Sequence, residues 1–148
     1  LVCTGNTCRS PMAEGIFKRY VSNDNLEDSI VVQSAGLSVV EGTPAAEYAV
    51  KTCAEAGIDI SGHRSRKLIP EDTIMWDLYC SMTETHAYIL EKAGIPSTKI
   101  YRPDNIPDPY GQGPDVYRAV REKLEKEVRL FYNKEVKRLL IFESQNKY

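Results

Sequence analysis

The stretch Cys3-Thr4-Gly5-Asn6-Thr7-Cys8-Arg9-Ser10, followed by Pro11, constrains this 148-residue chain more than any other. A cysteine, five residues and an arginine form a short loop, and Ser10-Pro11 is typical of the cap and first residue of a helix. A loop wrapped at a helix N-terminus directs several backbone N–H groups at one point, where the helix dipole adds positive potential. The sequence therefore predicts a phosphate-sized anion site between a strand and a helix.

Side chains of this loop have the chemistry of phosphoryl transfer. Cys3 would lie beneath the anion as a nucleophile, because N–H groups and a nearby cation favour a thiolate. Arg9 offers a planar fork for two phosphoryl oxygens, which lysine could not reproduce. Ser10 can donate its hydroxyl to the sulfur, and Gly5 allows a close backbone approach to the anion. The alternative is a structural turn in which Cys3 and Cys8 are small buried side chains, but such a turn has no use for the arginine.

The apolar pattern predicts strands separated by helices. Four segments have helical spacing: 10–21, a segment after Pro44, a segment after Thr83, and 116–131. Four extended apolar runs accompany them: 1–2, 30–32, 77–81 and 99–101. This alternation implies βαβ units and right-handed crossovers. We therefore expect an α/β fold, namely a three-layer α/β/α sandwich with a central four-stranded parallel sheet and the phosphate-binding loop after strand 1.

A single domain is expected over residues 1–148, with 42% hydrophobic and 27% charged residues. The net charge of −2 gives no reason to expect a nucleic-acid partner. No apolar run approaches the roughly 20 residues of a membrane span, so no membrane partner is expected. Because Leu1 stands only two residues before Cys3, we expect the first strand to be truncated at the N-terminus, with apolar residues missing upstream.

The four cysteines do not form a disulfide scaffold in a chain of this length. A catalytic thiol needs a reducing compartment, which predicts a cytoplasmic location. Cys3, Cys8, His63 and His86 could in principle bind zinc, but the cysteine spacing lies at the edge of the structural range and no second close pair completes the site. We expect neither a metal nor a cofactor.

The full string resembles the signature of the low-molecular-weight protein-tyrosine phosphatases, VCxGNxCRSP in one-letter code. Further similarity runs from residue 2 to about 110, with a helix after it. The resemblance implies a single catalytic domain in which Cys3 forms a cysteinyl-phosphate and Arg9 binds the phosphoryl group. It also implies a phosphate-binding loop made of Thr4, Gly5, Asn6, Thr7, Cys8, Arg9 and Ser10.

Asp108 is the candidate general acid, because one carboxyl can protonate the leaving oxygen and then activate water. The flanking Pro107 and Pro109 reduce the freedom of its loop. From the residues alone, an Asp-Pro pair is more simply a plain turn. The family, however, carries its acid in an Asp-Pro-Tyr or Asp-Pro-Phe loop late in the chain, which Asp108-Pro109-Tyr110 matches. Asp104, the other candidate, lacks this motif.

Asn6 is expected to be structural, since its side-chain amide can hold the loop in a strained shape. The resemblance implies that Ser10, Ser34 and His63 hold this asparagine in turn. From the residues alone, His63 is more simply a surface residue on a basic connection.

The resemblance assigns roles to three further residues. It implies that Val40 and Tyr110 form a wall of the pocket, and that Cys8 is the redox partner that forms a disulfide with Cys3 on oxidation. From the residues alone, Tyr110 is as simply explained by loop packing, and Cys8 by packing under the loop.

The family acts on phosphotyrosine, so we expect hydrolysis of a phosphoprotein substrate. Thr7 favours an alternative: the bacterial protein-arginine phosphatase branch carries threonine here, where typical phosphotyrosine members have a larger aliphatic residue. A thioredoxin-coupled arsenate reductase would need a partner cysteine near Cys80. A non-catalytic phosphopeptide-binding module would usually have lost the cysteine, the arginine or the acid. No G-x-x-x-x-G-K-[ST] string is present, which excludes a Walker-type nucleotide site.

Overall fold

A computed structural model describes residues 1–147 of the chain. Its strands are short and parallel. β1 (Val2–Cys3) pairs with β2 (Ala35–Gly36), and β3 (Tyr79–Cys80) pairs with β4 (Ile100–Tyr101). A single parallel bridge between Val2 and Ser81 joins the two pairs, and the Met82 N–H donates to the Val2 carbonyl at 3.0 Å. The predicted α/β fold is confirmed, but the strands form two two-stranded sheets, because pairing between β1 and β3 is limited to this bridge.

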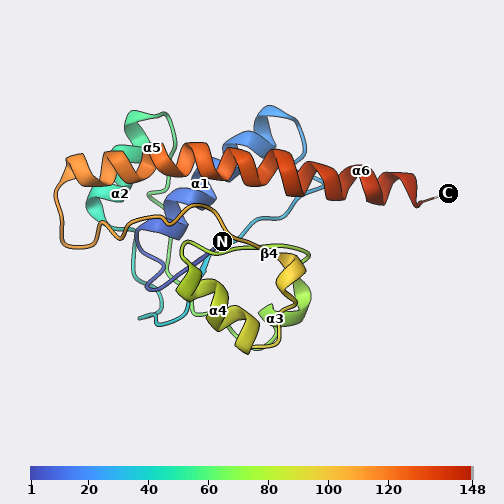
Figure 1. Ribbon diagram of the computed structural model, residues 1–148. Helices are drawn as coiled ribbons and strands as arrows, with labels where there is room; N and C mark the ends of the chain where they lie inside the picture. Colours follow the sequence, from blue (N-terminus) through green and yellow to red (C-terminus); the bar gives the residue numbers. More distant parts are fainter. Residues whose placement is uncertain (148) are drawn as a thin grey trace.

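Helices are the main regular structure of the chain (Figure 1). They are α1 (Arg9–Asn23), α2 (Glu47–Glu55), α3 (Asp72–Met75), α4 (Glu84–Lys92), the 3₁₀ turn η1 (Ser97–Lys99), α5 (Pro114–Phe131), the π-helical turn η2 (Tyr132–Val136) and α6 (Lys137–Gln145). All four predicted helices are present, with ends displaced by a few residues. The apolar spacing predicted these helices correctly, because an amphipathic helix buries one stripe of side chains.

The prediction of a strand at 30–32 was wrong. The Ile30 N–H donates to the Leu26 carbonyl in a turn, and the Val31 side chain is 73% exposed. β2 begins only at Ala35, whose N–H donates to the Leu1 carbonyl. An apolar, β-branched run forms a strand only where another backbone lies alongside it to complete the hydrogen bonds.

Side chains of the strands alternate between two apolar clusters. Cys3 and Cys80 face the cluster that contains buried residues of α1, α2 and α5. Val2, Tyr79 and Ile100 face a smaller cluster with residues of α4. Because successive side chains of a strand point to opposite faces, the strands lie between these two clusters. Figure 1 shows α1, α2 and α5 in the upper part of the molecule and α3 and α4 in the lower part.

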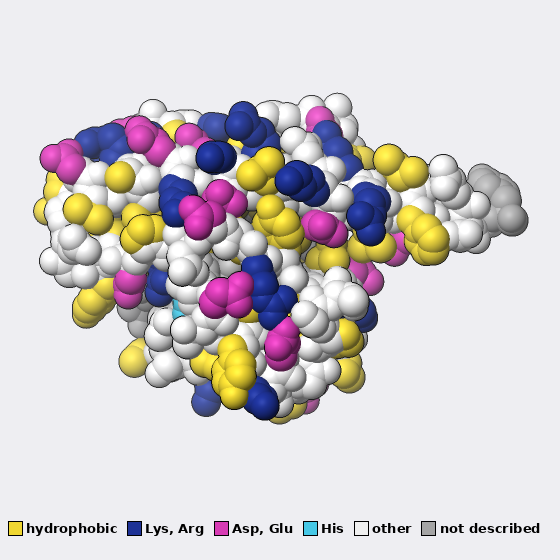
Figure 2. Space-filling view, in the orientation of Figure 1, with side chains coloured by type: hydrophobic (Ala, Val, Ile, Leu, Met, Phe, Trp, Pro, Cys, Tyr) yellow, Lys and Arg dark blue, Asp and Glu magenta, His cyan; other side chains and the backbone are white. Residues whose placement is uncertain are grey.

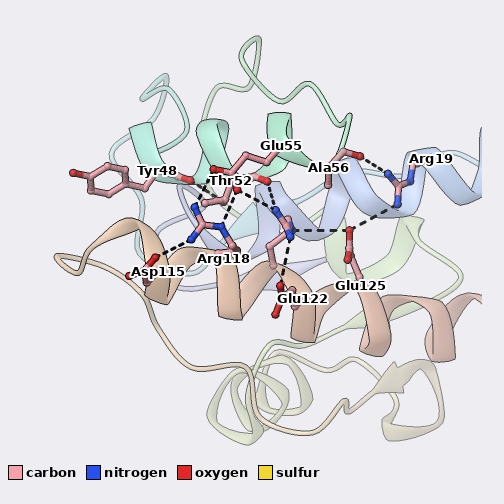
Figure 3. A network of polar contacts seen from close by, with 10 residues as sticks. Arg19, Tyr48, Thr52, Glu55, Ala56, Asp115, Arg118, Glu122 and Glu125 are labelled. Atoms are coloured by element: carbon pink, nitrogen blue, oxygen red, sulfur yellow. Dashed lines mark hydrogen bonds and ion pairs between the residues drawn. The ribbon is translucent and has the colours of Figure 1, made fainter.

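A network of polar contacts fixes α5 against α2 (Figure 3). Arg118 pairs with Glu55 at 2.9 Å and with Asp115 at 2.8 Å. The buried Arg121 donates to the Thr52 carbonyl at 2.6 Å. These contacts hold the first half of α5, and the loop that precedes α5 carries Asp108.

The face formed by α5 mixes basic and acidic side chains, as expected for a chain with little net charge (Figure 2). Within residues 1–147, no helix has both the length and the apolar run that crossing a bilayer requires.

Candidate active site

The loop from Cys3 to Ser10 lies between the end of β1 and the start of α1, at the carboxyl ends of the strands. Parallel α/β sheets bind their ligands at this edge. The loop forms a pocket of about 220 Å³. It is lined by Cys3, Thr4, Gly5, Asn6, Thr7, Cys8, Arg9, Asp108 and Tyr110. The fold thus brings the Asp-Pro-Tyr segment to a loop about 100 residues before it in the sequence.

Cys3 lines this pocket and is 2% exposed. It receives the Asn6 N–H at 3.3 Å, and its Sγ lies 2.8 Å from the Ser10 Oγ. Because the Ser10 oxygen already accepts from the Asn6 amide, its proton is available for the sulfur. Two hydrogen-bonding groups therefore lie against the sulfur.

Ser10 does not cap the first helix, contrary to the sequence-based prediction. Helix α1 begins one residue earlier, at Arg9, and the capping residue Cys8 makes no side-chain cap bond. The Ser10 hydroxyl is directed instead toward Cys3 and Asn6. The helix start therefore depends on the loop's internal hydrogen bonds.

Asn6 organises the loop from within. It is fully buried and has φ of +56°, a left-handed conformation that non-glycine residues seldom adopt. Its amide nitrogen donates to Ser10 at 2.8 Å and to Ser34 at 2.9 Å. Its side-chain oxygen accepts from the Arg66 N–H at 2.9 Å, and its carbonyl accepts from His63 Nε2 at 2.7 Å. The structure thus brings the three expected partners, Ser10, Ser34 and His63, to Asn6.

Sequence reasoning missed the fourth partner, Arg66, and the carboxylate that holds it. The Arg66 guanidinium makes two contacts of 3.0 Å with Asp72, whose side chain is 2% exposed. Asp72 also accepts from the Ile69 N–H and the Trp76 indole. Burial alone would raise the pKa of Asp72, but these donors outweigh it and lower the pKa to about 2. No local motif marks this pair in the sequence.

Arg9 contacts both loops of the site. It is 6% exposed, and its Nη1 donates to the Ile106 carbonyl at 3.2 Å. Its Nη2 lies 3.7 Å from Asp108 Oδ2. Asp108 itself is 56% exposed in its side chain and accepts from the Tyr110 N–H at 3.1 Å. An arginine, a carboxyl group and a cysteine sulfur therefore meet in one pocket.

The Cys8 side chain contacts helix α5. Its Sγ lies 3.3 Å from the Tyr117 hydroxyl of α5, and all four cysteines are free. Burial raises the pKa of the Cys8 thiol, although hydrogen bonds from Tyr117 and Thr7 act in the opposite direction. Cys8 is thus held as a neutral thiol at neutral pH, and no spacing in the sequence indicated Tyr117 as its neighbour.

Of the two expected wall residues, only Tyr110 lines the pocket, with 76% of its surface exposed. Val40 lies outside the lining and is 80% exposed. The Val40 carbonyl accepts from Ser65 at 2.6 Å and from Thr43 at 2.9 Å, so these bonds fix its backbone while its side chain stays in solvent.

His86 is the further site residue that sequence reasoning missed. It lies in the first turn of α4, is 4% exposed, and contacts Thr4 through Nε2 at 2.9 Å and Thr83 through Nδ1 at 3.0 Å. Burial, assisted by the Arg9 charge and opposed by Asp108, lowers the pKa of His86 to about 4. Within residues 1–147, no group of three His, Cys, Asp or Glu side chains could hold a metal ion.

Comparisons with known proteins identify the family of the chain. The family model for "Low molecular weight phosphotyrosine protein phosphatase" matches residues 1–140. The chain is 34% identical over 137 residues to a protein-arginine-phosphatase of Bacillus subtilis, covering 86% of this chain and 89% of the relative. It is 33% identical over 136 residues to the low molecular weight protein-tyrosine-phosphatase Wzb of Escherichia coli, covering 87% and 88%.

A solved structure of the same family has a similar fold. The low molecular weight protein tyrosine phosphatase from T. tengcongensis superposes with a TM-score of 0.82 at 36% identity, covering 90% of this chain and 95% of that chain. A family match over nearly the whole chain and relatives above 30% identity lead to one conclusion. The chain belongs to the low molecular weight phosphotyrosine protein phosphatase family and is a cysteine-dependent phosphatase.

Proposed function

We propose that this chain hydrolyses phosphotyrosine in protein substrates, with Cys3 as nucleophile, Arg9 as phosphate ligand and Asp108 as general acid and base. One observation carries the proposal. The Cys3 sulfur, with hydrogen-bond contacts to Ser10 and Asn6, shares a pocket with an arginine that lies 3.7 Å from an aspartate. A buried guanidinium beside a supported sulfur suits a tetrahedral dianion.

In the first step the Cys3 thiolate attacks phosphorus in line with the leaving oxygen. An S–P bond forms as the P–O bond breaks, and Asp108 gives its proton to the departing phenolate oxygen. Arg9 and the loop N–H groups stabilise the equatorial oxygens. The proximity of Asp108 to Arg9 supports this division of roles, because both would then face the same phosphoryl group.

In the second step Asp108 takes a proton from water, whose oxygen attacks phosphorus. The S–P bond breaks, inorganic phosphate leaves, and the sulfur returns to its thiolate form, which the Ser10 hydroxyl supports. No step requires a metal or cofactor, since Arg9 and the amides provide the positive charge.

A second candidate substrate is phosphoarginine, and one observation favours it. Threonines occupy two positions of the pocket lining, Thr4 and Thr7, while the aromatic contribution comes from the exposed Tyr110. Hydroxyl groups suit the N–H donors of a phosphoguanidinium better than a phenyl face. Turnover of phosphotyrosine and phosphoarginine peptides, measured side by side with Thr7→Ile as control, distinguishes the two substrates.

The nucleophile is tested by Cys3→Ser. We expect turnover of p-nitrophenyl phosphate to fall by about 10⁴-fold or more, because a serine hydroxyl is not ionised at neutral pH. Binding of inorganic phosphate should remain, since the loop and Arg9 are unchanged. Cys53→Ser, in a buried position of α2, is the matched control. Retained turnover in Cys3→Ser would refute the assignment.

We further propose that residues 1–148 act as one phosphatase domain and that the two strand pairs form one four-stranded layer in the order β2-β1-β3-β4. The Val2–Ser81 bridge between the pairs supports this order. The four free cysteines support a reducing, cytoplasmic setting, in which the Cys3 thiolate persists.

A further inference from the structure

A chain of three side chains leads from helix α4 into the pocket. Thr83, the capping residue of α4, accepts the His86 N–H at 3.3 Å, and its oxygen lies 3.0 Å from His86 Nδ1. On the other side of the ring, Nε2 lies 2.9 Å from the Thr4 hydroxyl. The imidazole is 4% exposed, whereas Thr4 is exposed and lines the pocket. A buried ring thus connects a helix cap to a hydroxyl at the rim.

One assignment of the protons gives every polar group of this chain a partner. A hydroxyl has one proton, and the Thr83 oxygen already accepts the backbone N–H of His86. In that assignment the Thr83 proton is donated to Nδ1, and Nε2 is the protonated ring nitrogen. Nε2–H then donates to the Thr4 oxygen, which leaves the Thr4 proton for a ligand. Burial and the Arg9 charge keep the pKa of His86 near 4, so the ring is neutral at neutral pH and has a single N–H.

The backbone beneath Thr4 is also fixed, so the hydroxyl has little freedom left. The Ser38 N–H donates to the Thr4 carbonyl at 3.0 Å, and the Leu37 N–H donates to the Cys3 carbonyl at 3.1 Å. Side-chain rotation of Thr4 is the remaining variable, and the His86 contact determines it. A donor that is held in place before the ligand arrives gives up less entropy on binding.

We propose that the Thr4 hydroxyl is a hydrogen-bond donor to the bound phosphoryl group, and that His86 and Thr83 are positioning residues that hold it in that role. The inference rests on the proposed function, because it assigns a side chain to the oxyanion that Cys3 would attack. The ligand class is a tetrahedral oxyanion. Thr4 follows the nucleophile directly and faces the same pocket as Arg9, where such an anion would bind.

Two pairs of variants test the inference. Thr4→Val removes the hydroxyl at nearly constant shape, and Thr4→Ser retains it. His86→Asn keeps an amide near the Nδ1 position for Thr83 but loses the contact with Thr4, whereas the longer His86→Gln reaches the Nε2 position. The readout is the inhibition constant of inorganic phosphate against p-nitrophenyl phosphate turnover, with a thermal unfolding midpoint for every variant.

We expect Thr4→Val and His86→Asn each to weaken phosphate inhibition by about tenfold, the value of one hydrogen bond to a charged group. Thr4→Ser and His86→Gln should recover most of the loss. The double variant Thr4→Val/His86→Asn should be no weaker than Thr4→Val alone, because His86 acts through Thr4. Nitrogen-15 NMR of the two histidines should find His86 protonated at Nε2.

Phosphate inhibition of Thr4→Val within twofold of the parent, or additive losses in the double variant, would overturn the inference. A His86 protonated at Nδ1 would overturn it as well. If His86→Asn does not fold, the Thr4 pair decides alone. If the parent protein neither turns over phosphate esters nor binds phosphate, the proposed function itself has failed. If the parent is active and Thr4→Val matches it, only this inference fails.

Discussion

The two loops that meet at the pocket are built in opposite ways. In the loop of the proposed nucleophile, four residues are at most 6% exposed and have hydrogen-bond partners within the protein, namely Cys3, Asn6, Arg9 and Ser10. In the loop of the proposed acid, the Asp108 side chain is 56% exposed and accepts the nearby Tyr110 N–H. The key residues of the Cys3 loop are therefore buried, whereas Asp108 lies at the surface.

The difference assigns each loop a physical role. The position of the sulfur depends on buried contacts, so it is fixed by folding. The acid loop is anchored at its start, where the Ile106 N–H donates to the Met82 carbonyl and the Ile106 carbonyl accepts from Arg9. Beyond this anchor, Asp108 relies on local turn bonds. Substitutions that remove one of these buried contacts should therefore affect stability as well as chemistry, whereas those at Asp108 should affect chemistry alone.

Arg9→Lys should have the largest effect of the four substitutions, because Arg9 contacts both loops. We expect kcat/KM for p-nitrophenyl phosphate to fall by about 10²–10³-fold, since an ammonium cannot replace a planar fork that faces two oxygens. Arg19→Lys, on the same helix α1, is the control. A loss of less than tenfold would mean that a point charge is sufficient and that the fork is not used.

Asp108→Asn tests the loop of the proposed acid by itself. We expect turnover of phenyl phosphate to fall by about 10²-fold, with a smaller loss for p-nitrophenyl phosphate, whose leaving group needs less protonation. The thermal unfolding midpoint should hardly change, because the side chain is mostly exposed. Asp104→Asn is the matched control, as Asp104 lies in the same loop but pairs with Lys123 at 3.1 Å. Equal losses with both esters would exclude Asp108 as the acid.

Asp72→Asn tests how far the support of the nucleophile loop extends. The pKa of Asp72 lies near 2, below its ordinary value of 3.8, so its charge stabilises the fold above pH 4. That contribution, about 2 kcal/mol, is lost as the pH falls from 4 to 2. Urea unfolding should find Asp72→Asn less stable by this amount at pH 7, with the gap closing at pH 2. A gap that is independent of pH would contradict the buried ion pair.

Arg118→Ala has the smallest expected effect and tests the anchor behind the acid loop. Arg118 is partly exposed and binds Glu55 and Asp115 at the start of α5. Exposed ion pairs contribute little, so the unfolding midpoint should fall by no more than about 2 °C, and by less in 1 M salt. A larger shift, or a loss of turnover that tracks Asp108→Asn, would show that the acid loop depends on this contact.

Local sequence determined a large part of this protein. The string from Cys3 to Pro11 predicted the loop, its place after β1 and the helix that follows, because the residue types that mark such a loop are contiguous in the sequence. Helical periodicity located α1, α2, α4 and α5 for the same reason. Asp108 was found through a short motif, and its arrival in the pocket with Tyr110 was expected from the family resemblance.

Only the tertiary structure decided which distant residues support the loop in detail. Arg66, which Asp72 holds, donates to Asn6. Tyr117 contacts Cys8 and His86 contacts Thr4, across separations that no local pattern records. Tertiary contacts also left 30–32 unpaired and Val40 outside the pocket. The physical reason is common to all of these. A hydrogen bond or a strand pairing needs two partners. When the second partner is distant in the sequence, only the fold determines which residue it is.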